Sequence, residues 1–278
     1  MIQRRSFNEA TVAITGNHHG IREGISRLLD ALGGPHHFFD PDDRILIKPN
    51  INGPLPAPAS VDPEFLATFI DYLIDEGFTN LAVAEASGRT WAPTESVVAK
   101  KGLLPYLEER NVPFYPLDDM EWRRVETGGD ALPHVHLPAL LDDFDRLVFL
   151  PNLKTHGNTG YTLTIKVAMG LTPLADRQAF HDGSVAAAIA DLARVVTPDL
   201  AIIDGRTAFI SGGPDEGELV HPNLMLASGD PVALDIEAVR ILLQHGAGEH
   251  IGENDPLATE TIRQMVGRVP EKITVKWV

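Results

Sequence analysis

The sequence predicts an α/β fold in which helices cover a mixed, mostly parallel β-sheet. Short runs of β-branched and aliphatic residues alternate along the chain with amphipathic segments. These runs carry few charges, as expected for strands that are buried on both faces of a sheet. With 278 residues, the chain is long enough for one large domain. We therefore expect one α/β domain over residues 1–278, or two abutting lobes at about residues 1–145 and 146–278.

Apolar runs predict strands, and the amphipathic segments between them predict helices. Strands are expected at residues 11–15, 44–48, 81–85, 146–150, 200–204 and 224–228. Helices are expected at residues 20–31, 63–76, 94–101, 103–110, 183–195 and 231–245. Asp62 before Pro63 is typical of a helix start, because the carboxylate accepts a backbone N–H and proline suits the first turn. A further helix is expected to begin near Thr159 and to place Thr162 and Lys166 on one face.

Residues 49–63 are predicted to form a long irregular loop, because this stretch contains five prolines together with Asn52 and Gly53. In α/β folds, loops that follow strands often bind ligands, because the carboxyl ends of parallel strands meet at one edge of the sheet. We expect the two ends of the chain to be loose.

Composition excludes several classes of protein. Acidic residues outnumber basic residues by 39 to 23, giving a formal net charge of −16, so we expect neither nucleic acid nor anionic membrane as a partner. The absence of cysteine excludes disulfides, thiolate-bound iron–sulfur clusters and cysteine-bound zinc. No apolar run approaches the roughly 18–20 residues of a membrane span, and no signal peptide is recognisable. We expect a cytoplasmic protein, and leave a homo-oligomer open.

The segment after the predicted strand at residues 146–150 contains three adjacent candidates. Lys154, Thr155 and His156 place a cation, a hydroxyl and an imidazole at the expected ligand-binding edge of the sheet. Further along, Lys166 lies in a run with no other charge, which favours either a functional ammonium or an aliphatic stem whose head reaches solvent. His156 is the best candidate for a general acid or base.

Similar side chains end other predicted strands. Lys48 is followed by Asn50, Glu85 ends the strand at residues 81–85, and Asp204 is expected to pair with a lysine of the site. His181, beside Asp182, is the candidate for a metal or hydrogen-bonding role. The lysines together would form a positive pocket in an acidic protein, suited to a carboxylate, a phosphate or another anion. The expected anion-binding residues are Lys48, Asn50, Glu85, Thr155, Thr162 and Asp204, and the expected catalytic residues are Lys154, His156 and Lys166.

Several motifs resemble those of the DUF362 family, over a region of about residues 44–239. The motifs are Lys48-Pro49-Asn50, Lys154-Thr155-His156, the Thr162 and Lys166 pair, His181, Asp204-Gly205, Gly212-Gly213-Pro214 and the run from Gly229 to Asp235. The resemblance implies a shared α/β fold but no activity, because the family name records an unknown function. Many relatives resemble fusions to ferredoxin-type modules, whereas this chain has no cysteine, so no iron–sulfur cluster is expected.

A more distant likeness is to the catalytic domain of lactate racemase, the nickel-pincer enzyme. Carried onto the matching residues, it implies that His156 acts as acid or base, Lys166 tethers a nickel-pincer nucleotide and His181 binds nickel. This chain has Lys48-Pro49-Asn50 and a Glu85-Ala86-Ser87-Gly88 stretch where the racemase pattern has Asp-x-x-Arg and Gly-Thr-His. The second catalytic histidine of that pattern is therefore missing.

Together these features predict a small-molecule enzyme acting on an anionic substrate. Isomerase or hydride-transfer chemistry of the racemase type is the leading expectation, with nickel or a nickel-pincer-like nucleotide as the implied cofactor. Two alternatives stay open. One is an enzyme of another class that uses Lys166 or His156 as base or nucleophile without a metal, and the other is a non-catalytic protein that binds an anion or a cofactor.

Overall fold

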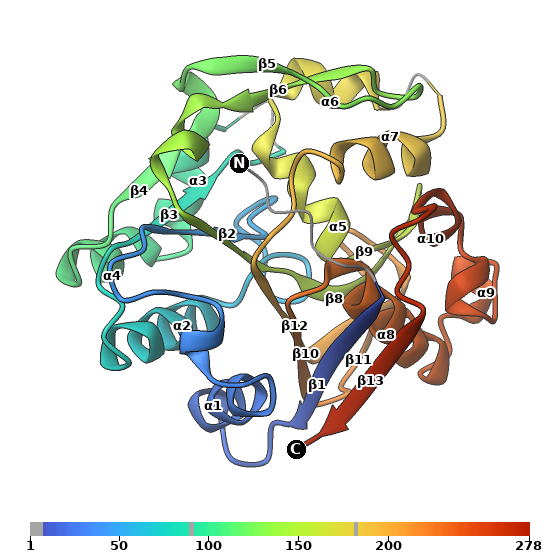
Figure 1. The fold of residues 1–278 in the computed structure, drawn as a ribbon, viewed down its shortest axis with the longest axis horizontal. Helices are drawn as coiled ribbons and strands as arrows, with labels where there is room; N and C mark the ends of the chain where they lie inside the picture. Colours follow the sequence, from blue (N-terminus) through green and yellow to red (C-terminus); the bar gives the residue numbers. More distant parts are fainter. Residues whose placement is uncertain (1–7, 89–91, 181–182) are drawn as a thin grey trace.

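The computed structural model describes residues 8–88, 92–180 and 183–278, and within these ranges the chain forms one large mixed sheet (Figure 1). The strands are β1 (Glu9–Gly16), β2 (Ile45–Pro49), β3 (Leu81–Glu85), β4 (Phe114–Pro116), β5 (Trp122–Glu126), β6 (His134–Pro138), β7 (Arg146–Leu150), β8 (Asn152–His156), β9 (Gly160–Thr162), β10 (Leu200–Gly212), β11 (Gly217–Val220), β12 (Leu224–Ser228) and β13 (Lys272–Trp277). The helices are α1 (Ile21–Ala31), α2 (Pro63–Asp75), α3 (Thr94–Lys100), α4 (Leu103–Glu109), α5 (Thr164–Val167), α6 (Leu174–Ala179), α7 (Val185–Leu192), α8 (Pro231–Gln244), α9 (Gly248–Ile251) and α10 (Glu260–Gln264).

The main path of the sheet runs in the order β13-β1-β12-β10-β7-β2-β3-β4. The pairs from β10 through β7, β2 and β3 to β4 are parallel, whereas β12 pairs antiparallel with both β10 and β1. The fold is therefore the expected mixed, mostly parallel α/β sheet. Because β1 lies between β12 and β13, strands from the two expected lobes are interleaved in one sheet (Figure 1).

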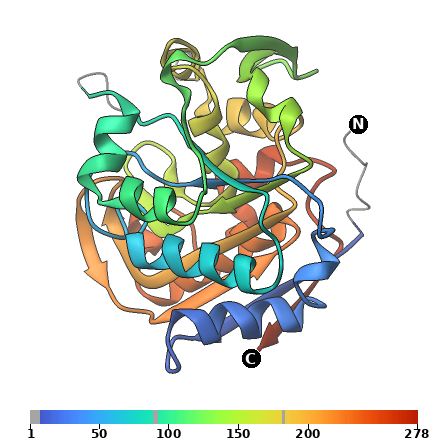
Figure 2. The same cartoon turned by 90° about the vertical axis from the view of Figure 1, so that its left-hand side faces the viewer.

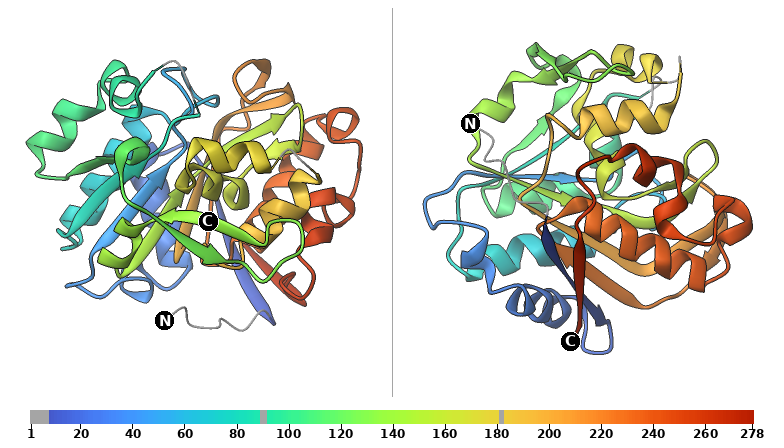
Figure 3. Two further views of the ribbon diagram at one scale, coloured as in Figure 1. Left: turned by 90° about the horizontal axis from the view of Figure 1, so that it is seen from above. Right: turned by 45° about the vertical axis from the view of Figure 1, so that its right-hand side comes forward.

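Helices cover both faces of the sheet, because alternate side chains of each strand point to opposite faces. Ile45 and Ile47 of β2 pack into the core under α1 to α4, whereas Leu46 packs into the other core, with residues of α5, α7 and α8. Figure 2 shows α1 and α2 together along one side, and Figure 3 shows α7 and α8 from two further directions.

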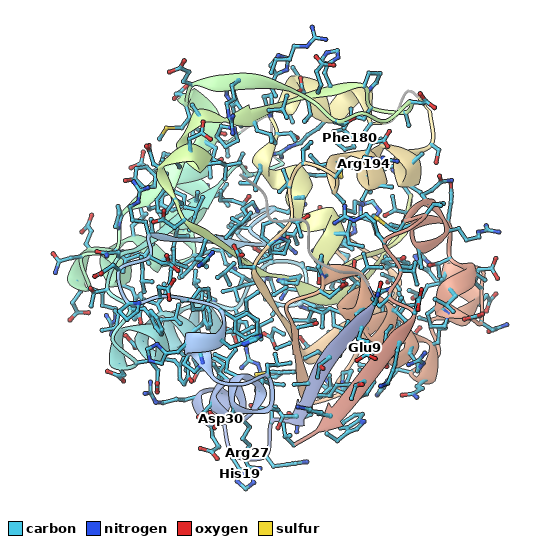
Figure 4. All side chains as sticks on the ribbon, viewed as in Figure 1. Glu9, His19, Arg27, Asp30, Phe180 and Arg194 are labelled. Carbon is cyan, nitrogen blue, oxygen red and sulfur yellow. The ribbon has the colours of Figure 1, made fainter. Side chains whose placement is uncertain are left out.

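A separate two-stranded ribbon, β5 and β6, packs near α6 and α7 at one end of the molecule (Figure 1). The Asp191 carboxylate of α7 accepts hydrogen bonds from the backbone N–H groups of Ala131 and Leu132, both at 3.0 Å. His136 Nδ1 of β6 lies 3.0 Å from the carboxylate of Asp176 in α6. Figure 4 shows the side chain of Phe180 in the same end of the molecule.

Most predicted elements are confirmed, including the start of α2, where the Asp62 carboxylate accepts the Glu64 N–H at 3.0 Å. The helix expected near Thr159 is wrong. Gly160 adopts a positive φ of 74°, the chain reverses, and β9 returns antiparallel to β8 with Thr162 opposite Lys154. Helix α5 begins only at Thr164, where the carboxylate of Asp235 accepts the N–H groups of Thr164 and Ile165 at 2.7 and 3.0 Å.

The expectation of a loose C-terminus is also wrong, because β13 pairs in parallel with β1 along its whole length. The long loop expected between β2 and α2 is confirmed: no helix or strand occurs between Pro49 and Pro63. Among the described residues, none of the helices combines the length and the apolar character needed to cross a bilayer.

Candidate functional site

A pocket of about 460 Å³ lies at the carboxyl ends of β2 and β3, beside β8 and the segment that contains α5 and α6. Parallel strands end at the same edge of a sheet, so side chains distant in sequence meet there. The pocket brings together most of the residues predicted as functional. Those that line it are Lys48, Asn50, Glu85, Lys154, His156, Thr162 and Lys166.

The β8–β9 hairpin explains why some neighbouring residues line the pocket and others do not. Side chains alternate along β8, so Lys154 and His156 share one face and Thr155 points to the other. Thr162 is paired with Lys154 in the register of the hairpin and lines the same pocket. Thr155 is fully buried and is not among the lining residues, so it does not join the predicted anion-binding group.

Lys48 and Glu85 form a buried ion pair in the wall of the pocket. Their Nζ and Oε1 atoms are 2.6 Å apart, and each side chain is 2% exposed. Lys48 also donates to the carbonyl of Pro49 at 2.7 Å, and the Glu85 carboxylate accepts N–H groups from Ile51 and Ala86. Burial lowers the pKa of Lys48 and raises that of Glu85, while their mutual attraction opposes both shifts.

Gly170 allows the close packing around this pair. A Cβ atom at this position would lie 2.5 Å from Lys48 Nζ and 2.8 Å from Glu85 Oε1. Any larger residue would therefore push the charged groups out of place.

Lys154 connects three segments of the chain. Its side chain is 1% exposed, and its Nζ donates to the carbonyls of Ala59 at 2.6 Å and of Pro214 at 3.3 Å. The first carbonyl belongs to the long loop after β2, and the second to the turn between β10 and β11. Gly213 is required in this turn, because a Cβ there would lie only 2.0 Å from the carbonyl oxygen of Thr155.

Lys166 has a different environment. It is partly exposed at the pocket, and its Nζ donates a 2.8 Å hydrogen bond to Thr159 Oγ1. Burial, and secondarily the positive charge of Lys154, lowers the pKa of Lys166 to about 7. The amine of Lys166 therefore loses its proton near neutral pH far more readily than an exposed lysine does.

His156 lies at the end of β8, in the pocket wall. Its Nδ1 accepts the backbone N–H of Asn158 at 3.1 Å. A ring nitrogen that accepts a hydrogen bond carries no proton, so this geometry fits the neutral imidazole with its proton on Nε2. In this form Nε2–H is a hydrogen-bond donor, and His156 acts as a general acid only from its imidazolium form.

Arg177 was missed by the sequence analysis. It lines the pocket and donates to three carbonyls: to Thr172 from Nε at 3.1 Å, to Ser87 from Nη1 at 3.2 Å and to Ala86 from Nη2 at 2.8 Å. Burial lowers its pKa, although a guanidinium keeps its charge in proteins. The available signal was a single arginine in the segment that also contains Lys166.

Two further residues predicted to belong to the site are Asp204 and His181. Asp204 does not line the pocket, and its carboxylate pairs with Arg206 at 2.8 Å rather than with a lysine. The reason is local: Arg206 is two residues further along β10, on the same face, and also binds Asp62 at 2.6 Å. His181 and Asp182 lie outside the described residues.

The metal assignment also depends on this undescribed segment. Within the described ranges, no group of three or more histidine, aspartate or glutamate side chains is arranged to hold a metal ion. The nickel-binding role expected of His181 therefore stays a prediction.

Comparison with known proteins places the pocket inside a recognised family. Residues 45–240 match the family described as "Domain of unknown function (DUF362)". The chain is also 30% identical, over 232 residues, to the "Thylakoid-associated protein sll1697" of Synechocystis sp.. That alignment covers 78% of this chain and 68% of the relative. All the lining residues, from Lys48 to Pro214, fall within the family match.

Proposed function

This chain belongs to the DUF362 family, and we propose that it is an enzyme that binds a small anionic substrate in the pocket and transfers protons with Lys166 and His156. The observation that carries the proposal is the convergence of cationic side chains from four separate segments on one pocket of an acidic protein. Those side chains are Lys48, Lys154, Lys166 and Arg177.

The charge of the pocket supports an anionic ligand. Among the described lining residues the one carboxylate is Glu85, which is already paired with Lys48. Cationic side chains therefore outnumber carboxylates among the described lining residues, and a local excess of positive charge attracts anions even when the net charge is −16. The volume of about 460 Å³ falls in the range of roughly 300–1,000 Å³ typical of small-molecule sites.

The two proton-transferring groups are suited to neutral pH. A base works best when its pKa is close to the working pH, and the pKa of Lys166 is lowered to about 7. His156 supplies a neutral imidazole with a proton on Nε2. Lys166 can therefore accept a proton, and His156 can donate one from its imidazolium form.

A racemase-like reaction is the second candidate, favoured by the presence of His156 and Lys166 in the same pocket. The tether implied by that resemblance fits the position of Lys166, whereas its metal-binding residue falls on His181, outside the described residues. Such a cofactor would supply hydride-transfer chemistry. Intact mass and nickel content of protein from a host that makes the cofactor test this candidate: an adduct on Lys166 is expected, and unmodified protein contradicts it.

For the cellular location, we propose the cytoplasm, because a strongly acidic chain is repelled by anionic membranes. The Synechocystis relative is described as thylakoid-associated, so peripheral membrane attachment is the competing assignment. Fractionation of the native host, with a salt wash of the membranes, distinguishes the two.

Calorimetric titration tests the proposed function, using a panel of small carboxylates and phosphate esters. We expect saturable binding of at least one class, weakened at least about tenfold in Lys154→Met. Lys100→Met is the matched control, because Lys100 is an exposed residue of α3 and does not line the pocket. Absence of binding across both classes, or equal weakening in the control, would contradict the proposal.

A further inference from the structure

The surroundings of Lys166 differ from those of an ordinary structural lysine. Its described hydrogen bond goes to a hydroxyl, that of Thr159, and none of the ion pairs among the described residues includes it. Val167, the last residue of α5, and Met169, just after the helix, line the same pocket. The nearby charge that acts on it is the like charge of Lys154. An amine with its pKa lowered in this way is partly uncharged near neutral pH, and its uncharged form is a nucleophile.

Lys48 and Lys154 lack this freedom. The ammonium of Lys48 is bound by Glu85 and by the carbonyl of Pro49, and that of Lys154 by the carbonyls of Ala59 and Pro214. Both side chains are also almost completely buried. They serve as fixed positive charges, whereas Lys166 is the lysine that reaches the pocket with a reactive nitrogen.

The other lining groups supply what an amine nucleophile requires. Arg177 and Lys154 place positive charge at the pocket, as needed to hold a carboxylate. His156 offers a proton for a leaving oxygen. Apolar side chains, Ile51 and Met169 among them, provide contact for the carbon skeleton.

We infer that Lys166 forms an imine with an oxo acid, so that the substrate of this pocket carries a carbonyl group as well as a carboxylate. This inference rests on the proposed function and narrows its substrate class. The ε-nitrogen adds to the carbonyl carbon, forming a C–N bond, while the oxygen gains a proton and the nitrogen loses one. The C–O bond then breaks and the hydroxyl leaves as water with a proton from the imidazolium form of His156, which becomes neutral, while the nitrogen lone pair completes the C=N bond, so no oxidant or reductant is consumed.

An imine explains why proton transfer would take place here. Once protonated, the C=N group withdraws electrons from the neighbouring carbon, which makes its C–H bond more acidic. Loss and return of that proton would interconvert isomers at this carbon. The reaction class is therefore proton transfer next to a carbonyl, in which Lys166 holds the substrate as the imine instead of acting as the base, and the imidazole of His156 removes and returns the proton.

Reductive trapping tests this inference on the full-length protein. The protein is incubated at pH 7 with pyruvate, 2-oxoglutarate or phenylpyruvate together with cyanoborohydride, and the products are measured by intact mass and peptide mapping. We expect one addition per chain, equal to the mass of the oxo acid less one oxygen atom, on Lys166. Labelling of Lys166 should follow pH with a midpoint of about 7, whereas exposed lysines should need pH near 10.

Variants separate a specific imine from general lysine labelling. Lys166→Met and Lys166→Arg should both abolish the addition, and Lys100→Met should leave it unchanged. His156→Ala should slow labelling of Lys166, whereas His19→Ala should not, because His19 lies beside α1 at a distant end of the molecule (Figure 4). Circular dichroism confirms that each variant is folded before its labelling is compared.

The outcomes distinguish this inference from the proposed function. If an oxo acid binds in calorimetry but Lys166 gains no mass, or if exposed lysines are labelled in preference to it, the imine is wrong and anion binding still stands. If neither carboxylates nor phosphates bind, both proposals fail.

Discussion

The two sides of the pocket each contain a lysine, but the two lysines differ in burial and in the group that binds the side-chain nitrogen. On the side of β2 and β3, Lys48 is almost fully buried and its charge is balanced by Glu85 at 2.6 Å. On the side of α5, Lys166 is partly exposed, donates to a neutral hydroxyl and experiences the like charge of Lys154. The comparison teaches that the partner of a lysine, more than its burial alone, separates a structural ion pair from a reactive amine.

Disrupting the buried pair of Lys48 and Glu85 should produce the largest loss of stability. Glu85→Gln removes the anion and leaves the Lys48 ammonium buried without a counter-charge, so we expect a loss of about 3–5 kcal/mol in the free energy of unfolding. Urea-induced unfolding measures it. Asp75→Asn is the control, because it breaks the exposed Arg22–Asp75 pair and should cost at most about 1 kcal/mol. A similar small loss in both variants would contradict a structural role for the buried pair.

Asp235→Asn should destabilise the start of α5, the helix that carries Lys166. The 1% exposed carboxylate accepts two N–H groups at the start of α5, and an asparagine retains one acceptor oxygen, so we expect a loss of about 1–3 kcal/mol. Four residues are too few for an independent helix, so Lys166 should also move. The pH midpoint of Lys166 labelling should then rise from about 7 toward 10.

Asp255→Asn is the matched control for this substitution. Asp255 accepts the Leu257 N–H at an exposed position far from α5 in sequence, and asparagine is an equally good cap. It should leave both stability and labelling nearly unchanged. An unaltered midpoint in Asp235→Asn would show that the carboxylate does not position Lys166.

Lys166→Met should change how stability depends on pH. Between about pH 7 and 10 the unfolded lysine holds a proton that the folded one has lost, so the unfolded state binds more protons. The free energy of unfolding of the native chain should therefore rise with pH in this window, by up to about 1.4 kcal/mol per unit relative to Lys166→Met. If the free energies of unfolding of the native chain and of Lys166→Met changed equally with pH, the lowered pKa of Lys166 would be contradicted.

Asp235 should affect stability in a different range of pH. Burial raises its pKa to about 7, so between about pH 4 and 7 the folded state holds more protons than the unfolded state. Its contribution to stability should fall as pH rises through that window, the opposite direction to Lys166. The two groups are therefore separable by comparing Asp235→Asn and Lys166→Met over the full range.

The smallest expected effect comes from Thr159→Val. The hydroxyl of Thr159 accepts a hydrogen bond from Lys166 and thus favours its charged form. Without it the pKa of Lys166 should fall from about 7 to a lower value, by an amount worth about 0.5–1.5 kcal/mol. Thr159→Ser keeps the hydroxyl and should preserve the labelling midpoint. A rise of the midpoint in Thr159→Val would mean that other groups determine the pKa.

Much of the fold could be predicted from local patterns. The continuous apolar runs at β3, β7 and β12 coincide with the expected strands, because strands buried on both faces need apolar residues at every position. Strand β8 was missed because Asn152, Lys154 and His156 make it polar. The turn at Gly160 was missed because Thr162 and Lys166 also fit helical spacing.

The candidate site was predictable only in part, for a related reason. Lys48, Glu85, Lys154 and Lys166 stood out because each is a charge at the end of a strand or within an apolar run. Arg177 did not stand out, because the carbonyls to which it donates, those of Ala86 and Ser87, are about 90 residues away in sequence.

By itself, the sequence determined six strands of the main sheet and most of the longer helices, where α2 begins, and which charged side chains would be found near strand ends, since these depend on neighbours a few residues away. Only the tertiary structure decided that Glu85 neutralises Lys48, that Arg206 pairs with Asp204, and that Lys166 lies close to the like charge of Lys154 with no ion pair of its own among the described residues. Electrostatic energies depend on distance in space and on burial, and neither quantity is set by separation along the chain.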